Sequence, residues 1–265
     1  MVSKNFVSRD LLVSVLDMKF KVLSYNIHKG FDVWGRWTLE DMGRALQTTH
    51  AEILLLQEVV GENKSLIKNY KSSPNERQFE FLADVVWPHY SYGKNAVFPD
   101  RHHGNAVLSK FPIESTHNLD ISTNRFEFRG LLHSQASLVP AGGRRLHLMT
   151  THLNLLEKGR KLQAARVIQW IQDEIPEDEP MILAGDFNDW PQGLSRIFEE
   201  SLELKECFQT LTGSHARTYP ALFPRLHLDR IYYRGLRLTN AEALSGAPWS
   251  SLSDHLPLFA EFEIE

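Results

Sequence analysis

Short runs of apolar residues recur along the chain, and most of them have the length and alternation typical of β-strands. Alternating apolar and polar positions at residues 20–26 predict a strand. Continuous apolar runs at residues 51–59 and 180–188 predict strands that are buried on both faces. The same patterns predict six further strands, at residues 90–98, 103–111, 129–139, 144–154, 226–235 and 256–264, with a hairpin turn at 141–143.

Three segments have helical patterns instead. The helices are predicted at residues 39–50, 78–87 and 159–175. In the third, Leu162, Ala165, Ile168 and Ile171 recur at helical spacing, and we expect them to form its buried face.

The order of these elements predicts the fold class. Strands dominate, helices lie between them, and we find neither a fixed-period repeat nor a linker that divides the chain. Two strand-rich halves with helices between them predict two sheets packed together, with helices on the outer faces. We expect residues 1–19 to form an N-terminal tail or short helix, and residues 20–265 a single domain.

Composition narrows the class of protein. The 265 residues are 42% apolar and 23% charged, as in ordinary globular proteins that bury a sizeable core. The net charge of -4 argues against general coating of nucleic acid, although it allows a local basic patch. The single cysteine, Cys207, excludes an internal disulfide and fits a reducing compartment. Without a recognisable signal peptide or membrane-spanning run, we expect a cytoplasmic protein.

The apolar strands share one further feature, because polar, metal-competent side chains stand at their ends. Each alone has an ordinary explanation as a turn residue or a hydrated side chain. Together they are costly, because carboxylates at the ends of buried strands must be paired, hydrated or metal-bound. Their oxygens are hard ligands that suit Mg²⁺ or Mn²⁺. The residues are Asn26, Glu58, His152, Asn154, Asp186, Asn188, Asp229, Asp254 and His255.

In order and flanking residues, seven motifs resemble the endonuclease/exonuclease/phosphatase superfamily. They are "YNIHKG", "LLLQEV", "GNAVLSKFPI", "THLN", "GDFND", "LDRIYY" and "SDHLPL", and the resemblance covers about residues 20–265. The DNase I-like fold of this superfamily implies an α+β class: a four-layer α/β/β/α sandwich of two mainly antiparallel sheets with helices on the outer faces. The fuller pattern is most similar to the bacterial YbhP-like branch. The resemblance implies a phosphoester hydrolase that uses Mg²⁺ or Mn²⁺.

The same resemblance implies a cation site. Glu58 would be the main ligand, and Asn26 would complete the site directly or through water. Asp254 would lie near the metal or near a second cation position.

The implied catalytic groups are five. His255 would bind the phosphate or act as general acid or base, with Asp229 orienting its ring. Asp186 would position or deprotonate the attacking water, Asn188 would hold that water or the phosphate, and His152 would donate to a phosphate oxygen.

Four further side chains are expected to contact substrate: His28, Asn105, Arg129 and Asn154. Arg129 would use its bidentate fork, although a surface arginine without that role is an equal alternative. Some nuclease relatives carry an acid where this chain has His28, so a ligand, a phosphate contact and neither role all stay open for it.

The motifs leave the substrate open. We favour a phosphodiesterase that acts on a small or lipid-linked diester by metal-assisted attack of water. A DNA or RNA nuclease is the alternative, since residues 217–237 carry five arginines interleaved with aromatic residues. Trp34 and Trp37 could serve a lipid substrate, as in a sphingomyelinase or phospholipase C. An inositol-phosphate phosphatase and a non-catalytic phosphate-binding module are the remaining alternatives, and the sequence indicates no obligate protein partner.

Overall fold

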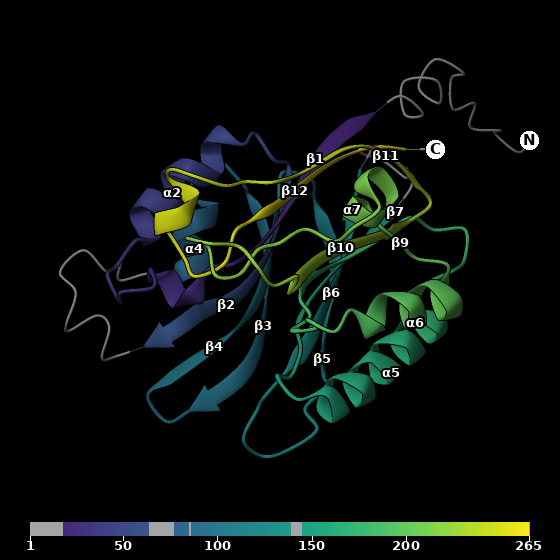
Figure 1. Cartoon of the computed structure of the whole chain (residues 1–265), viewed down its shortest axis with the longest axis horizontal. Helices are drawn as coiled ribbons and strands as arrows, with labels where there is room; N and C mark the ends of the chain where they lie inside the picture. The colour runs from purple at the N-terminus through teal and green to yellow at the C-terminus, as the bar shows by residue number, and fades with distance from the viewer. Residues whose placement is uncertain (1–17, 64–76, 85, 139–144, 265) are drawn as a thin grey trace, which may run out of the picture.

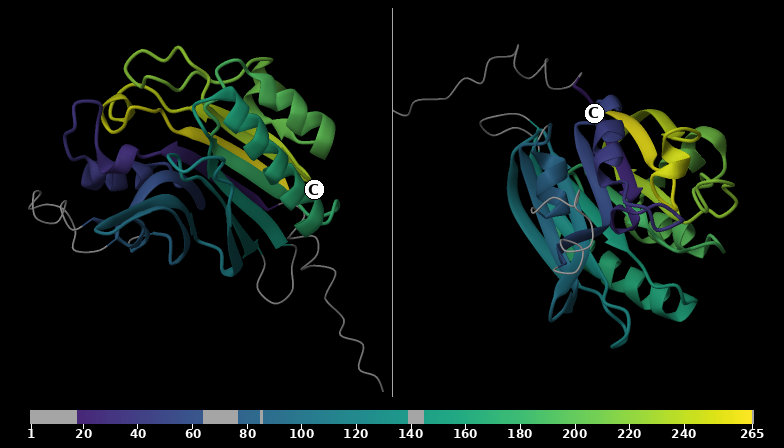
Figure 2. Two further views of the ribbon diagram at one scale, coloured as in Figure 1. Left: turned by 90° about the horizontal axis from the view of Figure 1, so that it is seen from below. Right: turned by 90° about the vertical axis from the view of Figure 1, so that its left-hand side faces the viewer.

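Two β-sheets pack face to face, and helices cover their outer sides (Figures 1 and 2). The computed structural model describes residues 18–63, 77–84, 86–138 and 145–264. The predicted fold class is confirmed. The predicted hairpin turn at 141–143 and most of the predicted tail lie outside the described residues, and the first strand begins at Lys19.

Sheet one contains six strands and one parallel pair, β1 with β2. Its other neighbours are antiparallel. In spatial order the strands are β11 (Leu236–Ala243), β12 (Leu258–Ile264), β1 (Lys19–Asn26), β2 (Ile53–Asn63), β4 (Arg101–Ser109) and β3 (His89–Phe98).

Sheet two repeats this plan, with β7 and β8 as its parallel pair. Its other neighbours are antiparallel. In spatial order the strands are β5 (Ile113–Asp120), β6 (Gly130–Ser137), β7 (Arg145–His152), β8 (Met181–Asp186), β10 (Asp229–Arg234) and β9 (Lys205–Glu206).

Strand alternation sorts the apolar side chains into layers. In β1, Phe20 and Val22 point into the core between the sheets. Leu23 and Tyr25 point the opposite way and pack beneath the helices of sheet one. Each central strand therefore buries both faces, as the continuous apolar runs predicted.

Four helices of the described residues form most of the outer layers. The helices α2 (Leu39–Thr48) and α4 (Gln78–Ala83) pack on sheet one, and the second is shorter than predicted. The helices α5 (Glu157–Glu174) and α6 (Gly193–Leu202) cover sheet two (Figure 1). The described residues also form the short helix α7 (Cys207–Thr212) and the 3-10 helices η1 (His28–Gly30) and η2 (Trp249–Ser251). Among the described residues, no helix combines the length and apolarity needed to span a bilayer.

The predicted buried face of α5 was right for Ile171 and for the partly buried Ile168, which pack in the core, and wrong for Leu162 and Ala165. Of the four predicted positions only Ile171 is fully buried, whereas Leu162 is 52% exposed and Ala165 is exposed. Polar side chains take part of the buried face because they bind the chain that precedes the helix. Gln163 donates to Asn154 Oδ1 at 2.9 Å, and its own Oε1 accepts from Asn154 N. The buried residues of α5 are Arg160, Gln163, Ala164, Val167 and Ile171.

Candidate active site

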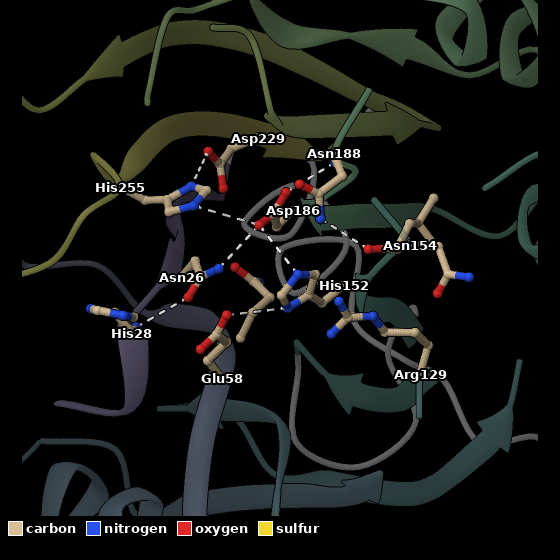
Figure 3. A network of polar contacts seen from close by, with 12 residues as sticks. Asn26, His28, Glu58, Arg129, His152, Asn154, Asp186, Asn188, Asp229 and His255 are labelled. Carbon is tan, nitrogen blue, oxygen red and sulfur yellow. Dashed lines mark hydrogen bonds and ion pairs between the residues drawn. The ribbon is translucent and has the colours of Figure 1, made fainter. Parts of the chain in front are cut away.

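The polar strand ends converge at one edge of the sandwich, as Figure 3 shows. In sheet two, His152 of β7 is the register partner of Asp186 of β8, which is in turn the partner of Asp229 of β10. Three neighbouring strands therefore present an imidazole and two carboxyl groups in one row. All three side chains are buried.

Gly185 makes the close approach of β7 and β8 possible. It has φ +149°, and a Cβ at this position would lie 2.0 Å from the Thr151 carbonyl oxygen. A larger residue would push the two strands apart. The glycine in "GDFND" thus sets the spacing between His152 and Asp186.

Sheet one contributes Asn26 and Glu58. Asn26 ends β1, is buried, and donates through Nδ2 to Asp186 Oδ2 at 3.0 Å, which joins the two sheets at the site. Glu58 lies in β2 at φ 56°, where the pairing with β4 is interrupted between Leu56 and Val59. Such an irregularity re-aims a side chain, and here it turns the Glu58 carboxylate toward the site.

His255 lies between two carboxyl groups. Its Nδ1 lies 2.9 Å from Asp229 Oδ2, and its Nε2 lies 3.6 Å from Asp186 Oδ2. The Thr218 hydroxyl also donates to Asp229. Because a carboxylate accepts, His255 carries a proton on Nδ1 and Asp229 fixes the orientation of the ring.

These neighbours shift the pKa values of both groups. Burial alone would lower the pKa of His255, but Asp229 and then Asp186 raise it to about 10. Burial raises the pKa of Asp186 to about 7, against the opposing effect of His255. The two carboxyl groups therefore favour the cationic imidazole, and burial favours the neutral form of Asp186 more than in an ordinary carboxyl group.

Glu58 has a different environment. Burial favours its neutral form, yet His152 and then Lys29 hold its pKa well below the ordinary range. Lys29 Nζ lies 2.5 Å from Glu58 Oε2, and His152 Nδ1 lies 3.8 Å from Oε1. The buried His152 has its own pKa lowered, by burial first and then by Arg129. Glu58 is thus favoured as an anion, and the Lys29 ammonium is in contact with its carboxylate.

Two groups of atoms offer donors for a divalent cation. Ligand atoms of Asp186, Asp229 and His255 lie within 4.8 Å of one another. Both ring nitrogens of His255 already face carboxylates, which favours proton transfer over ligation in this group. The oxygens of Glu58 and Asn26 form the second group, and they match the hard-ligand preference of Mg²⁺. This donor set fits the implied cation.

Asp254 lies at the margin of this second group. Its side chain is partly exposed, and Oδ1 lies 3.9 Å from His28 Nδ1. His28 has φ 44° and donates its backbone N–H to Asn26 Oδ1 at 3.1 Å, while its Nδ1 lies 3.1 Å from the Phe31 carbonyl oxygen. The structure brings both residues beside Asn26.

Asn188 and Arg129 also lie at the site (Figure 3). The Asn188 backbone N–H donates to Asp186 Oδ1 at 3.0 Å, and its Nδ2 donates to the Leu153 carbonyl at 2.9 Å. Arg129 is half-buried, and its charge lowers the pKa of His152. Asn188 therefore holds the Asp186 carboxyl group in position, and Arg129 supplies positive potential beside His152.

Two predicted substrate contacts are engaged elsewhere. The amide of Asn154 binds Thr123 Oγ1 at 2.9 Å and accepts from Gln163. Asn105 Nδ2, on sheet one, donates to the Gly130 and Thr150 carbonyls of sheet two at 3.1 and 3.3 Å. Both residues are buried and these contacts give them structural roles, while their contact with substrate stays a prediction.

Three residues of the site were not predicted. Lys29 follows His28 in "YNIHKG" and contacts Glu58, so its place in the motif was an available signal. His103 lies near Glu58 and Lys29, and its pKa is lowered to about 4, by burial first and then by Lys29. Thr218 reaches Asp229 from eleven positions upstream, and local sequence offered no signal for that contact.

Part of the arginine- and aromatic-rich segment 217–237 is structural, and its role as a nucleic-acid surface stays a prediction for the exposed part, which includes Phe223. Arg230 is fully buried and donates to the His227 carbonyl at 2.6 Å. Tyr232 and Tyr233 are buried in the cores. Exposed arginines of this segment are separated by these packed residues.

The fold and this site define a class of DNase I-like phosphoesterases, and comparison with known proteins identifies the family. Residues 23–255 match the endonuclease/exonuclease/phosphatase family, and the chain belongs to it. The members of this family are hydrolases of phosphoester bonds.

Individual relatives agree with the assignment. The chain is 42% identical to the uncharacterized protein YbhP of Escherichia coli K12 over 92% of this chain and 96% of YbhP. An endonuclease/exonuclease/phosphatase of Beutenbergia cavernae superposes with a TM-score of 0.75 at 18% identity, covering 93% of this chain and 72% of that one. Danio rerio TDP2, solved with a single-strand DNA product, has a TM-score of 0.68 at 21% identity and covers 93% and 100%.

Proposed function

We propose that this protein is a Mg²⁺- or Mn²⁺-dependent phosphodiesterase. One observation supports this most strongly: His255 lies between Asp229 and Asp186, and Asp186 accepts a hydrogen bond from Asn26 of the other sheet. A cationic imidazole paired with a carboxyl group of raised pKa suits attack of water on a phosphate ester.

In this proposal, each residue of the site has a separate role in hydrolysis. Asp186, with a pKa of about 7, accepts a proton from the attacking water. His255 binds a phosphate oxygen through Nε2–H or donates that proton, while Asp229 holds its ring. Arg129 adds positive charge against the anionic substrate. Asn188 keeps Asp186 in position.

Glu58 and Asn26 would hold the cation, with Asp254 at its margin. When bound, the cation would polarise the phosphoryl oxygen and stabilise charge on the leaving oxygen. Lys29, which contacts Glu58, would then be available to the phosphate.

A substrate panel tests this proposal. The panel contains an aryl phosphodiester, an aryl phosphomonoester, single-stranded RNA and DNA, an abasic duplex, an inositol polyphosphate and phospholipid vesicles. We expect turnover of the diester to exceed that of the monoester. Preference for the monoester would contradict the diesterase assignment.

Exposed aromatic residues beside the site support a nuclease as the second candidate. Phe98 and Phe128 pack edge to face at 6.4 Å, and both are partly exposed next to Arg129. Arg101 lies over Phe98 at 4.8 Å. Phe126 is 79% exposed, with Arg125 over its ring. Alternating arginines and exposed rings suit phosphates and unstacked bases.

Phe98 and Phe128, here called the aromatic rim, distinguish the two candidates, because only a nucleic-acid substrate would stack its bases on them. If the substrate is single-stranded nucleic acid, replacing Phe98 and Phe128 together by alanine raises its KM and leaves the KM of a small aryl diester unchanged. Leu162→Ala, at an exposed position on α5, is the control substitution. Equal effects of the rim and control variants would remove the nuclease candidate.

A further inference from the structure

A second cluster of hydroxyl, imidazole and carboxylate groups lies at α6 and the neighbouring edge of sheet two. Ser195 Oγ, on α6, lies 2.9 Å from His215 Nε2. His215 Nδ1 lies 2.8 Å from Glu206 Oε2. The Tyr232 hydroxyl of β10 lies 2.8 Å from Ser195 Oγ. These four side chains form one continuous hydrogen-bonded chain.

The direction of the hydrogen bonds follows from the carboxylate. Glu206 accepts, so His215 carries its proton on Nδ1. Its Nε2 lone pair then accepts the proton of the Ser195 hydroxyl. Burial raises the pKa of the Tyr232 phenol, which therefore stays protonated and donates to Ser195 Oγ. The cluster is thus a series of three groups: a hydroxyl, a base that accepts its proton, and an acid that orients the base.

This cluster opens onto a pocket of about 450 Å³. Ser195 is half-buried in its wall, whereas His215 and Glu206 are only 4% and 5% exposed. A small molecule in the pocket can reach the hydroxyl while the base and the acid stay shielded. Much of the remaining lining is polar, including Gln192, Arg196, Lys205, Gln209 and Thr210.

We propose that Ser195, His215 and Glu206 form a second, metal-independent site that hydrolyses small, polar carboxylic esters. The arrangement is that of a nucleophile with an adjacent base oriented by a third group. The size and polarity of the pocket match a short polar acyl group and not a long aliphatic one.

The reaction proceeds in two balanced steps. Ser195 Oγ bonds to the ester carbonyl carbon while its proton passes to His215 Nε2. The bond from that carbon to the alcohol oxygen breaks, and His215 returns the proton to the leaving oxygen. Water then attacks the acyl-serine with its proton passing to His215, and the bond to Ser195 Oγ breaks. The proton returns to Oγ, and the products are the acid and the alcohol.

Two features favour negative charge next to Ser195. It is the third residue of the ten-residue helix α6, whose amino end carries partial positive charge. The Tyr232 hydroxyl is a second donor within reach of the reacting atoms.

Sheet two separates this site from the phosphoester site. Ile231 points into the core between the sheets, whereas Tyr232 packs in the outer core with α5 and α6. Asp229 shares the strand parity of Ile231. The two sites therefore lie on opposite faces of β10, and either can be disabled alone.

The test uses the full-length protein in EDTA and a fluorophosphonate probe, which forms a covalent adduct with activated serines. We expect one adduct, mapped by peptide mass spectrometry to Ser195. The Ser195→Ala variant should lose the adduct, and His215→Gln should slow labelling by at least about 100-fold. Hydrolysis of p-nitrophenyl acetate in EDTA should fall in parallel.

Control variants separate this activity from a structural role of the cluster. Ser201→Ala, an exposed serine on the same helix, and His255→Ala should label as fast as the unaltered protein. Mapping the adduct in the unaltered chain keeps the test valid even if Ser195→Ala melts at a lower temperature. Absence of an adduct at Ser195, or labelling that requires a metal ion, would overturn the proposal.

Discussion

At the scale of single residues, the site depends on how each charge is compensated. Glu58 is held as an anion at neutral pH by the Lys29 ammonium, which contacts its carboxylate. His255 is held as a cation by Asp229 and Asp186. Asp186 has a raised pKa because burial disfavours its anionic form. In the proposed function, this division would let one cluster bind a cation and also transfer protons.

Glu58 gives the first prediction. Glu58→Gln should weaken Mn²⁺ binding by at least about tenfold, because it replaces the anionic ligand by a neutral one. Isothermal titration calorimetry checks this result. Glu62→Gln is the matched control on the same strand and should bind Mn²⁺ as before. Unchanged affinity in Glu58→Gln would place the cation elsewhere.

The pKa of His255 gives the second prediction. Its folded-state pKa of about 10 exceeds the ordinary 6.5, so the bound proton stabilises the fold. That contribution is complete below pH 6.5 and is lost as the pH rises through about 10. In EDTA, we expect the free energy of unfolding to fall across this window in the unaltered protein and less in His255→Gln. Denaturant titrations at several pH values measure both slopes, and parallel slopes would contradict the assignment.

At the scale of elements, α5 shows how polar contacts can override an apolar pattern. The contacts of Gln163 with Asn154 orient the helix so that Leu162 faces outward. Arg160, also buried, donates to the Leu155 carbonyl. The pattern of apolar residues alone carried no information on these contacts.

A pair of truncations tests this orientation. Ile171→Ala should lower the free energy of unfolding by about 2–5 kcal/mol, because it leaves a cavity in a packed core. Leu162→Ala should change it by less than about 0.5 kcal/mol, because the side chain is mostly exposed. Chemical denaturation measures both, and a large loss in Leu162→Ala would support the face first predicted.

Asn105 provides the corresponding test between the sheets. Its amide links sheet one to two carbonyls of sheet two, so Asn105→Ala should cost about 1–3 kcal/mol of stability and leave KM unchanged. The exposed Asn118→Ala is the control and should stay within about 0.5 kcal/mol. A raised KM with unchanged stability would support Asn105 as a substrate contact.

At the scale of the whole molecule, the sequence predicted the central strands, the helices α2, α4 and α5, and the layered architecture, but it missed α6 and α7. The apolar runs of the central strands are long because both faces are buried. The sequence also missed β5 and β11, because these edge strands lie at the surface and lack a continuous apolar face. The very short β9 offered no pattern at all.

The same contrast holds for the site. Residues at the ends of buried strands, such as Asp186 and Asn26, could be predicted because the strands fix their position. Thr218 could not, because a long-range contact brings it to Asp229. The structural roles of Asn154 and Asn105 were hidden because an amide's hydrogen-bond partners are set by tertiary packing.

The most direct test of the central claim measures hydrolysis of bis(p-nitrophenyl) phosphate in Mg²⁺, in Mn²⁺ and in EDTA, with the unaltered protein and with His255→Ala. We predict turnover that stops in EDTA, returns with added cation, and falls by about 10²–10⁴-fold in His255→Ala while circular dichroism stays unchanged. Equal rates in EDTA and in Mg²⁺, or full activity in a folded His255→Ala variant, would contradict the account.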